Sequence, residues 1–73
     1  MSVFISKNSI GQVIKLESDD YKFWFNAGLL HRDDGPARMW IKTKCCEWWI
    51  NNTFIMSDMV LDEDKWNRWW NNA

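Results

Sequence analysis

The residues best suited to chemistry lie in the string LHRDDGPA, residues 30–37, which places the only histidine of the chain beside an arginine and two aspartates. A histidine next to carboxylates is a combination that general acid–base catalysis uses. The sequence offers His31 no nucleophile at a telling position, no second histidine and no glycine-rich phosphate loop. We therefore expect a non-enzymatic protein without catalytic residues. In this interpretation Asp33 or Asp34 accepts hydrogen bonds from turn amides, and Arg32 pairs with a carboxylate or bridges two hairpins.

Cys45 and Cys46 are the only cysteines of the chain, and they are adjacent. Neighbouring residues on a strand point to opposite faces, so a disulfide between these two would be strained. Two thiols and one histidine are also too few ligands for a typical zinc site. We expect both thiols to be reduced, one facing inward and one outward, and we expect no bound metal or cofactor.

Arginines and tryptophans supply the remaining candidate chemistry. Arginine binds phosphate through paired hydrogen bonds and indole stacks on bases, so Arg32, Arg38 or Arg68 beside indoles is a candidate nucleotide site. The spacing of these residues is not diagnostic, and an ordinary solvated surface explains it more simply. The net charge of −1 creates no field that attracts nucleic acid, so direct DNA binding is not expected.

Four carboxylates form a small acidic block at Asp58, Asp62, Glu63 and Asp64. Such a block can mimic phosphates toward a basic groove of another protein. We favour the simpler role, in which Asp62 caps a helix while Glu63 and Asp64 stabilise the positive end of its dipole. Leu61 and Trp66 then occupy the two positions of a hydrophobic staple.

The elements that must position these residues belong to one domain, residues 1–73, which carries seven tryptophans and four phenylalanines. So short a domain has a small core, and we expect the surplus indole to face a partner. No apolar run approaches the roughly 20 residues of a membrane helix. The N-terminus lacks the apolar segment of a signal peptide. We therefore expect a cytoplasmic protein outside any membrane.

Apolar alternation and turn residues predict an α+β fold, a small antiparallel β-meander of about five to six strands followed by one C-terminal α-helix. The meander spans residues 1–56 and the helical part spans residues 57–73, with the helix running from Asp62 to about Asn71. The predicted strands are residues 2–6, 12–17, 21–26, 37–42 and 45–51, with short return segments at 29–31 and 54–56.

An internal repeat assigns the faces of these strands. The phrase FWFN at residues 23–26 is echoed by WWIN at residues 48–51, an offset of 25 residues. Alternation along the two copies then predicts one core face, formed by Tyr21, Phe23, Phe25, Cys46, Trp48 and Ile50. The same offset adds Ile14, Leu16, Met39 and Ile41 to that face. The other, partly wet face carries Trp24, Trp40 and Trp49.

Trp66, Trp69 and Trp70 form one stripe of the predicted helix. This stripe can pack on the core face of the sheet, on the face with Trp24, or on a second protomer. We favour the core face, which gives a two-layer domain.

The string LHRDDGPA resembles the HRxDGPA-type repeat of small proteins and repeat arrays from bacteria and their phages. In that family the phrase W-x-x-N-G-x-x-HR-x-DGPA recurs along a β-rich chain, loosely like a MORN array of hairpins. The matching residues are Trp24, Asn26, Gly28, His31, Arg32, Asp34, Gly35, Pro36 and Ala37. Ala27 adds one residue to the turn, and the second copy has Met56 and Ser57 in place of the His-Arg pair. The resemblance covers roughly half of the chain, and it implies hairpins and a phage or accessory-gene setting.

Our leading hypothesis is a phage-type inhibitor that binds a host or defence protein in the host cytoplasm through exposed tryptophans. The alternative is an oligomeric sponge that sequesters a nucleotide immune signal, cyclic nucleotides included. Both hypotheses include a homodimer or higher homo-oligomer, because exposed aromatics and sheet edges favour pairing. The candidate binding residues are Trp24, His31, Arg32, Arg38, Trp40, Trp49, Trp66, Arg68, Trp69 and Trp70.

Overall fold

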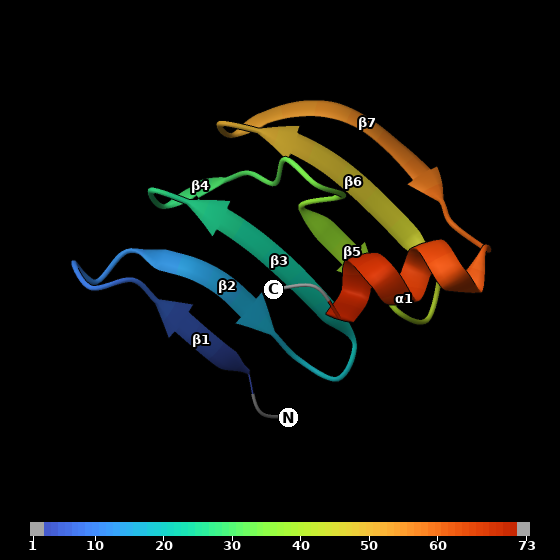
Figure 1. Cartoon of the computed structure of the whole chain (residues 1–73), viewed down its shortest axis with the longest axis horizontal. Coiled ribbons are helices and arrows are strands. Elements are labelled where there is room, and N and C mark those ends of the chain that lie inside the picture. Colours follow the sequence, from blue (N-terminus) through green and yellow to red (C-terminus); the bar gives the residue numbers. More distant parts are fainter. Residues whose placement is uncertain (1–2, 72–73) are drawn as a thin grey trace.

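The computed structural model describes residues 3–71 as an antiparallel sheet with a helix on one of its faces (Figure 1). The elements are β1 (Phe4–Lys7), β2 (Val13–Glu17), β3 (Tyr21–Asn26), β4 (Leu29–Leu30), β5 (Arg38–Trp40), β6 (Cys45–Ile50), β7 (Thr53–Met59) and α1 (Glu63–Asn71). The predicted fold class is confirmed, with seven strands instead of five to six. The first strand was predicted over residues 2–6, of which Ser2 lies outside the described residues.

The strands follow one another across the sheet in the order β1-β2-β3-β5-β6-β7, and β4 pairs with β3 beside this path. Every neighbouring pair is antiparallel, so the chain forms a meander. Strand β5 is only three residues long. The string LHRDDGPA precedes β5 and lies between β3 and β6, bonded to Trp24 of β3 and to Glu47 and Trp49 of β6. There the Arg32 amide donates to the Trp49 carbonyl at 3.2 Å, and the Ala37 amide donates to the Glu47 carbonyl at 2.8 Å.

The β3–β4 and β6–β7 hairpins have the same two-residue turn. Ala27 and Gly28 have φ of 51° and 78°, and Asn51 and Asn52 have φ of 46° and 65°. Positive φ at both central positions defines the type I′ turn, whose twist matches that of the flanking strands. Because Ala27 corresponds to Asn51, the structural repeat is 24 residues and not the 25 that the sequence match suggested.

This difference of one residue changes which face each side chain occupies, because successive side chains of a strand point to opposite faces. In β6 the predicted inward direction of Cys46 and Trp48 is confirmed. In β3 the prediction was wrong, because Trp24 faces the helix and is only 6% exposed. Phe23 pairs with Leu16 on the opposite face, so the predicted inward direction of both residues was also wrong.

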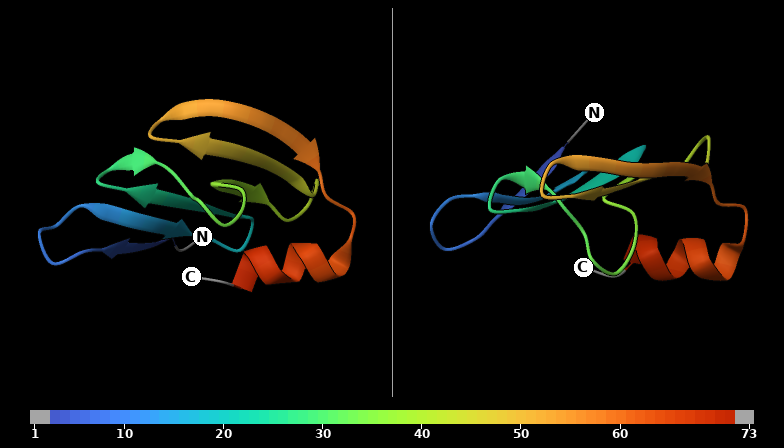
Figure 2. Two further views of the ribbon diagram at one scale, coloured as in Figure 1. Left: turned by 45° about the horizontal axis from the view of Figure 1, so that its top comes forward. Right: turned by 90° about the horizontal axis from the view of Figure 1, so that it is seen from above.

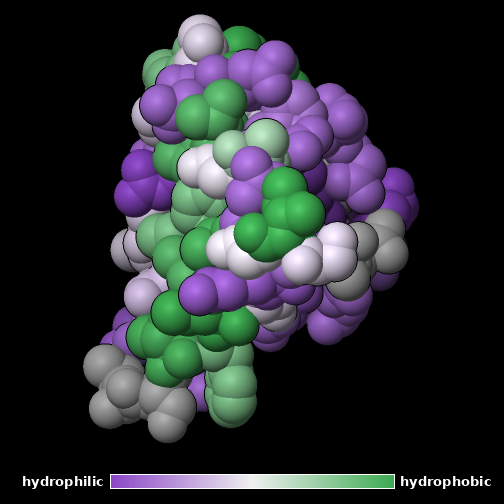
Figure 3. All heavy atoms as spheres, turned by 90° about the vertical axis from the view of Figure 1, so that its left-hand side faces the viewer, coloured by the Kyte–Doolittle hydropathy of each residue, from purple (hydrophilic) through white to green (hydrophobic). Residues whose placement is uncertain are grey.

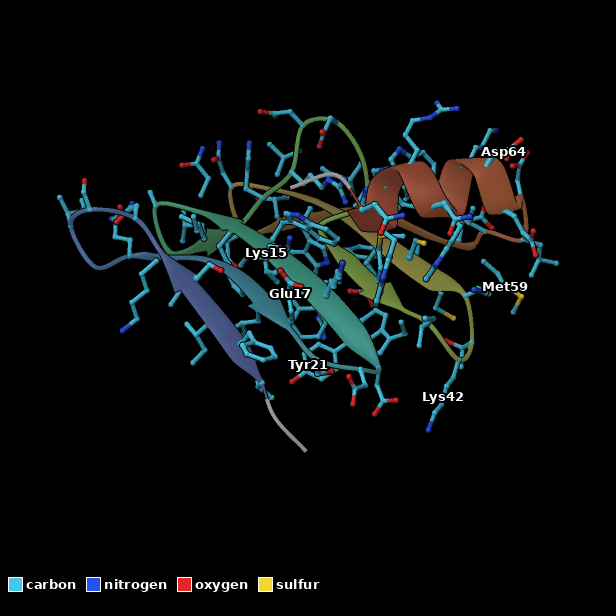
Figure 4. All side chains as sticks on the ribbon, turned by 60° about the horizontal axis from the view of Figure 1, so that its bottom comes forward. Lys15, Glu17, Tyr21, Lys42, Met59 and Asp64 are labelled. Carbon is cyan, nitrogen blue, oxygen red and sulfur yellow. The ribbon has the colours of Figure 1, made fainter. Side chains whose placement is uncertain are left out.

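The core lies between the sheet and α1, as the two-layer prediction expected (Figure 2). Its buried members are Trp24, Met39, Cys46, Val60 and Trp66, and Ile41, Trp48, Trp69 and Trp70 pack against them. On the same face, β2 carries the charged pair Lys15 and Glu17 (Figure 4), whose ion pair is 2.8 Å long. The apolar part of the face therefore lies on the strands that α1 covers.

Helix α1 begins and ends where the sequence predicts. Asp62 accepts a hydrogen bond from the Lys65 amide at 3.1 Å, which confirms the N-cap, and α1 ends at Asn71. The predicted staple contributes little, because Leu61 is 72% exposed while Trp66 is buried. Within residues 3–71, no helix has the length and apolarity that crossing a membrane requires.

Candidate functional site

Arg32 connects the LHRDDGPA string to the sheet and to the helix, and it is only 6% exposed. Its Nε donates to Asp34 Oδ1 at 2.8 Å, and its Nη1 donates to the Pro36 carbonyl at 3.1 Å. Its Nη2 donates to the carbonyl of Trp69 at 2.7 Å, near the C-terminal end of α1. The guanidinium carbon lies 4.0 Å from the centre of the Trp24 ring. The predicted pairing of Arg32 with a carboxylate is confirmed, and all three of its nitrogens have acceptors inside the chain.

His31 follows β4 and connects the β3–β4 hairpin to the turn of the β6–β7 hairpin. Its Nδ1 accepts a hydrogen bond from the Asn51 amide at 3.0 Å, so the neutral ring carries its proton on Nε2. Nε2 lies 3.0 Å from Asp33 Oδ1. The backbone adds a bond from the His31 amide to the Trp24 carbonyl at 3.1 Å. Both ring nitrogens are engaged within the fold, so the geometry supports the structural role of this histidine.

The face of the sheet opposite α1 carries a continuous group of aromatic side chains. We call it the aromatic face and define it by Tyr21, Phe23, Arg38, Trp40, Trp49 and Phe54. Tyr21 and Phe23 stack at 4.6 Å between centroids, and Phe23 meets Trp40 edge-on at 5.4 Å. No other element among residues 3–71 covers this face (Figure 2). Figure 3 shows hydrophobic residues running down the side away from α1, while the helix side is mainly hydrophilic.

Polar contacts hold the aromatic face in position. The guanidinium carbon of Arg38 lies 4.7 Å from the ring centres of both Phe23 and Trp40. Its Nη1 is 3.3 Å from Glu47 Oε1, and the same oxygen accepts a hydrogen bond from Trp49 Nε1 at 2.9 Å. Trp49 meets Phe54 edge-on at 5.5 Å. Within residues 3–71, the buried Nε of Arg38 has no hydrogen-bond partner.

The structure separates the ten predicted binding residues into three groups. Trp24, Arg32 and Trp66 are buried within the chain, at 6%, 6% and 3% exposure. His31, Trp69 and Trp70 are half-buried in contacts within the chain, and Arg68 is exposed on α1. The structure brings three of the predicted residues together on the aromatic face, namely Arg38, Trp40 and Trp49.

Sequence reasoning missed Tyr21 and Phe23, which it placed in the core. The signal that identifies them is the turn alignment. The sequence echo aligns Asn26 with Asn51. Aligning the turn residue Ala27 with Asn51 instead shifts β3 by one residue and places Tyr21 and Phe23 on the aromatic face.

The other candidate chemistries are not assembled on one surface. Arg32 lies on the helix side of the sheet and Arg38 on the aromatic face, so a nucleotide clamp that uses both is not formed. Cys46 is buried, and desolvation raises the pKa of its thiol to about 12, whereas Cys45 is half-buried. Residues 3–71 contain no cluster of three or more His, Cys, Asp or Glu side chains that could bind a metal ion.

Comparisons of the chain with protein-family models, with curated proteins and with solved structures found no match.

Proposed function

We propose that this protein is a non-enzymatic interaction protein that binds a partner protein through the aromatic face. The observation that carries the proposal is the group of ordered aromatic side chains on the sheet face opposite α1, where Phe54 is exposed and the other members are half-buried. Tryptophan, tyrosine and arginine are the side chains that most often dominate binding energy at protein interfaces.

The contacts within the face support this role. Arg38 is held between two rings and paired with Glu47, and Trp49 is held by the same carboxylate. Side chains that are already ordered lose little conformational entropy on binding, so their contacts contribute more fully to affinity. The Arg38–Glu47 pair also offers polar specificity at the centre of an otherwise apolar surface.

The class of partner follows from the resemblance of LHRDDGPA to repeats of phage and bacterial accessory proteins. We propose a host or defence protein as the partner and inhibition as the outcome. In this proposal the string builds the scaffold and the aromatic face makes the contact.

A capture experiment with matched variants tests the proposal. The bait is the tagged full-length chain, and the test variant is the double substitution Trp40→Ser with Trp49→Ser. The control is Arg68→Ala, which changes an exposed side chain on α1, away from the aromatic face. Circular dichroism and thermal melting establish that all three baits are folded.

The proposal expects the wild type and Arg68→Ala to retain the same bacterial protein, and the double variant to lose it. Retention of that protein by the folded double variant, or no retention by the wild type, would overturn the proposal.

A further inference from the structure

Strand β7 forms one edge of the sheet, and it is unusually open. All seven of its residues, Thr53–Met59, are exposed, and they include Phe54, Ile55, Met56 and Met59. An edge strand presents unpaired backbone N–H and C=O groups, and proteins commonly protect such edges with lysine or proline. The sequence of β7, TFIMSDM, contains neither residue. Its outer side therefore offers backbone pairing to another extended chain.

A groove of about 330 Å³ lies beside this edge, between β7 and α1. Its apolar lining includes Trp48 and Trp69, which meet edge-on at 5.6 Å, together with Met56 and Leu61. Figure 4 shows Met59 and Asp64 at this end of the molecule, where β7 leads into α1. The groove is on the helix side of the sheet, because Met56 pairs with Trp48 and Asp58 pairs with Cys46.

The charges around the groove are mainly negative. Asp58 and Asp62 line it, together with one lysine, Lys65. Within residues 3–71, no lysine or arginine nitrogen lies within 4.0 Å of either carboxylate, although six ion pairs form elsewhere. Glu63 and Asp64 add two more acidic residues in the first turn of α1. The groove therefore combines an apolar lining with two carboxylates that lack a cationic partner.

We infer that β7 and this groove bind an extended segment of a partner protein that carries apolar and basic side chains on the same face, two residues apart in its sequence. The segment adds to the sheet as a further strand, with its backbone paired to β7. Its apolar side chains enter the groove, and its lysines or arginines lie beside Asp58 and Asp62. A second copy of β7 fits less well, because β7 carries no basic residue to pair with Asp58.

The groove lies on the opposite side of the sheet from the aromatic face, to which β7 contributes Phe54. Met56 and Asp58 point to the helix side of the sheet, whereas Ser57 pairs with Glu47 and points to the aromatic side. Adjacent residues of β7 therefore allow the same substitution to be made on either side of one strand.

The test is an NMR titration of the full chain, at physiological salt, with two capped octapeptides. One peptide repeats Thr-Ile-Thr-Lys twice, which puts isoleucine and lysine on the same face of a strand, and the other has glutamate in place of each lysine. The proteins are the wild type, Met56→Lys and the matched control Ser57→Lys, each confirmed as folded by thermal melting. Met56 is exposed, so the lysine at this position does not enter the core.

The inference expects saturable binding of the lysine peptide to the wild type and to Ser57→Lys, with a loss of at least about tenfold in Met56→Lys. The glutamate peptide should bind at least about tenfold more weakly than the lysine peptide. Equal binding of both peptides, equal binding by Met56→Lys, or no saturable binding would overturn it. A wild type that sediments as a dimer and takes no peptide would identify a second copy as the occupant and would also overturn it.

Discussion

Gly35 and Trp69 are in direct contact, because a Cβ atom added to Gly35 would lie 2.7 Å from Cδ1 and 3.0 Å from Cγ of the Trp69 indole. Gly35 does not have a positive φ, whereas Gly11 and Gly28 do. Unusual dihedral angles therefore do not explain the glycine at this position. A glycine is required here because the helix packs against the loop backbone.

Gly35→Ala should lower the free energy of unfolding by about 1–3 kcal/mol, since the added methyl group must displace a packed ring. Urea unfolding measures this change. In a Trp69→Leu background the ring is absent, and the cost of Gly35→Ala should fall below about 1 kcal/mol. An equal cost in both backgrounds would contradict the packing explanation.

Removal of Arg32 should destabilise the fold strongly. Arg32→Ala leaves the carbonyls of Pro36 and Trp69 without their donor, at a cost of about 3 kcal/mol. Arg32→Lys should recover only part of this, because one ammonium group cannot reproduce three directed contacts. Arg68→Ala is the control and should change stability by less than about 0.5 kcal/mol. Chemical denaturation gives these values, and a lysine variant as stable as the wild type would refute the role assigned to the guanidinium.

The two type I′ turns predict opposite effects at equivalent positions. Ala27 has a φ of 51°, which alanine adopts at a cost, so Ala27→Asn should stabilise the protein by about 1 kcal/mol. Asn51 has a φ of 46°, so Asn51→Ala should destabilise it by a similar amount, about 1 kcal/mol. Thermal melting of the two variants measures both changes. Shifts of the same sign would argue against a shared turn geometry.

Cys46 should make the fold sensitive to alkaline pH. Burial raises the pKa of its thiol to about 12 from an ordinary value of 9.0, so above pH 9 the unfolded chain loses this proton while the folded chain keeps it. Stability is therefore retained below pH 9 and falls between pH 9 and 12, by about 1.4 kcal/mol from pH 8 to pH 10.

Urea unfolding at these two pH values measures the fall due to Cys46. Cys46→Ala should remove this part of the pH dependence, and Cys45→Ala, which retains the buried thiol, is the matched control. The same fall in Cys46→Ala as in the wild type would assign it to other groups.

The elements of this fold were predictable because local signals determine them. The N-cap at Asp62, the end of α1 at Asn71 and the positions of the two hairpins all follow from residues close in sequence. The faces of β3 were not predictable from the echo of FWFN by WWIN. That echo aligns Asn26, the last residue of β3, with Asn51, the first residue of a turn. A slip of one residue exchanges the two faces of a strand.

The candidate site was predictable only in part, because contacts between distant segments decide it. Trp24 of β3 and Trp40 of β5 both lie in strands whose sequences alternate, and residue type alone does not tell which of them is buried. Trp24 is buried because Arg32 packs on its ring and α1 covers that face. Trp40 remains on the aromatic face beside Arg38.

The most direct test of the account is an NMR spectrum of the seven indole N–H groups, recorded before and after the captured partner is added. The account predicts that the signals of Trp40 and Trp49 shift or broaden, while those of the buried Trp24 and Trp66 keep their positions. Shifts concentrated at Trp24 and Trp66, or seven unchanged signals in a complex that demonstrably forms, would contradict the claim that the aromatic face is the binding surface.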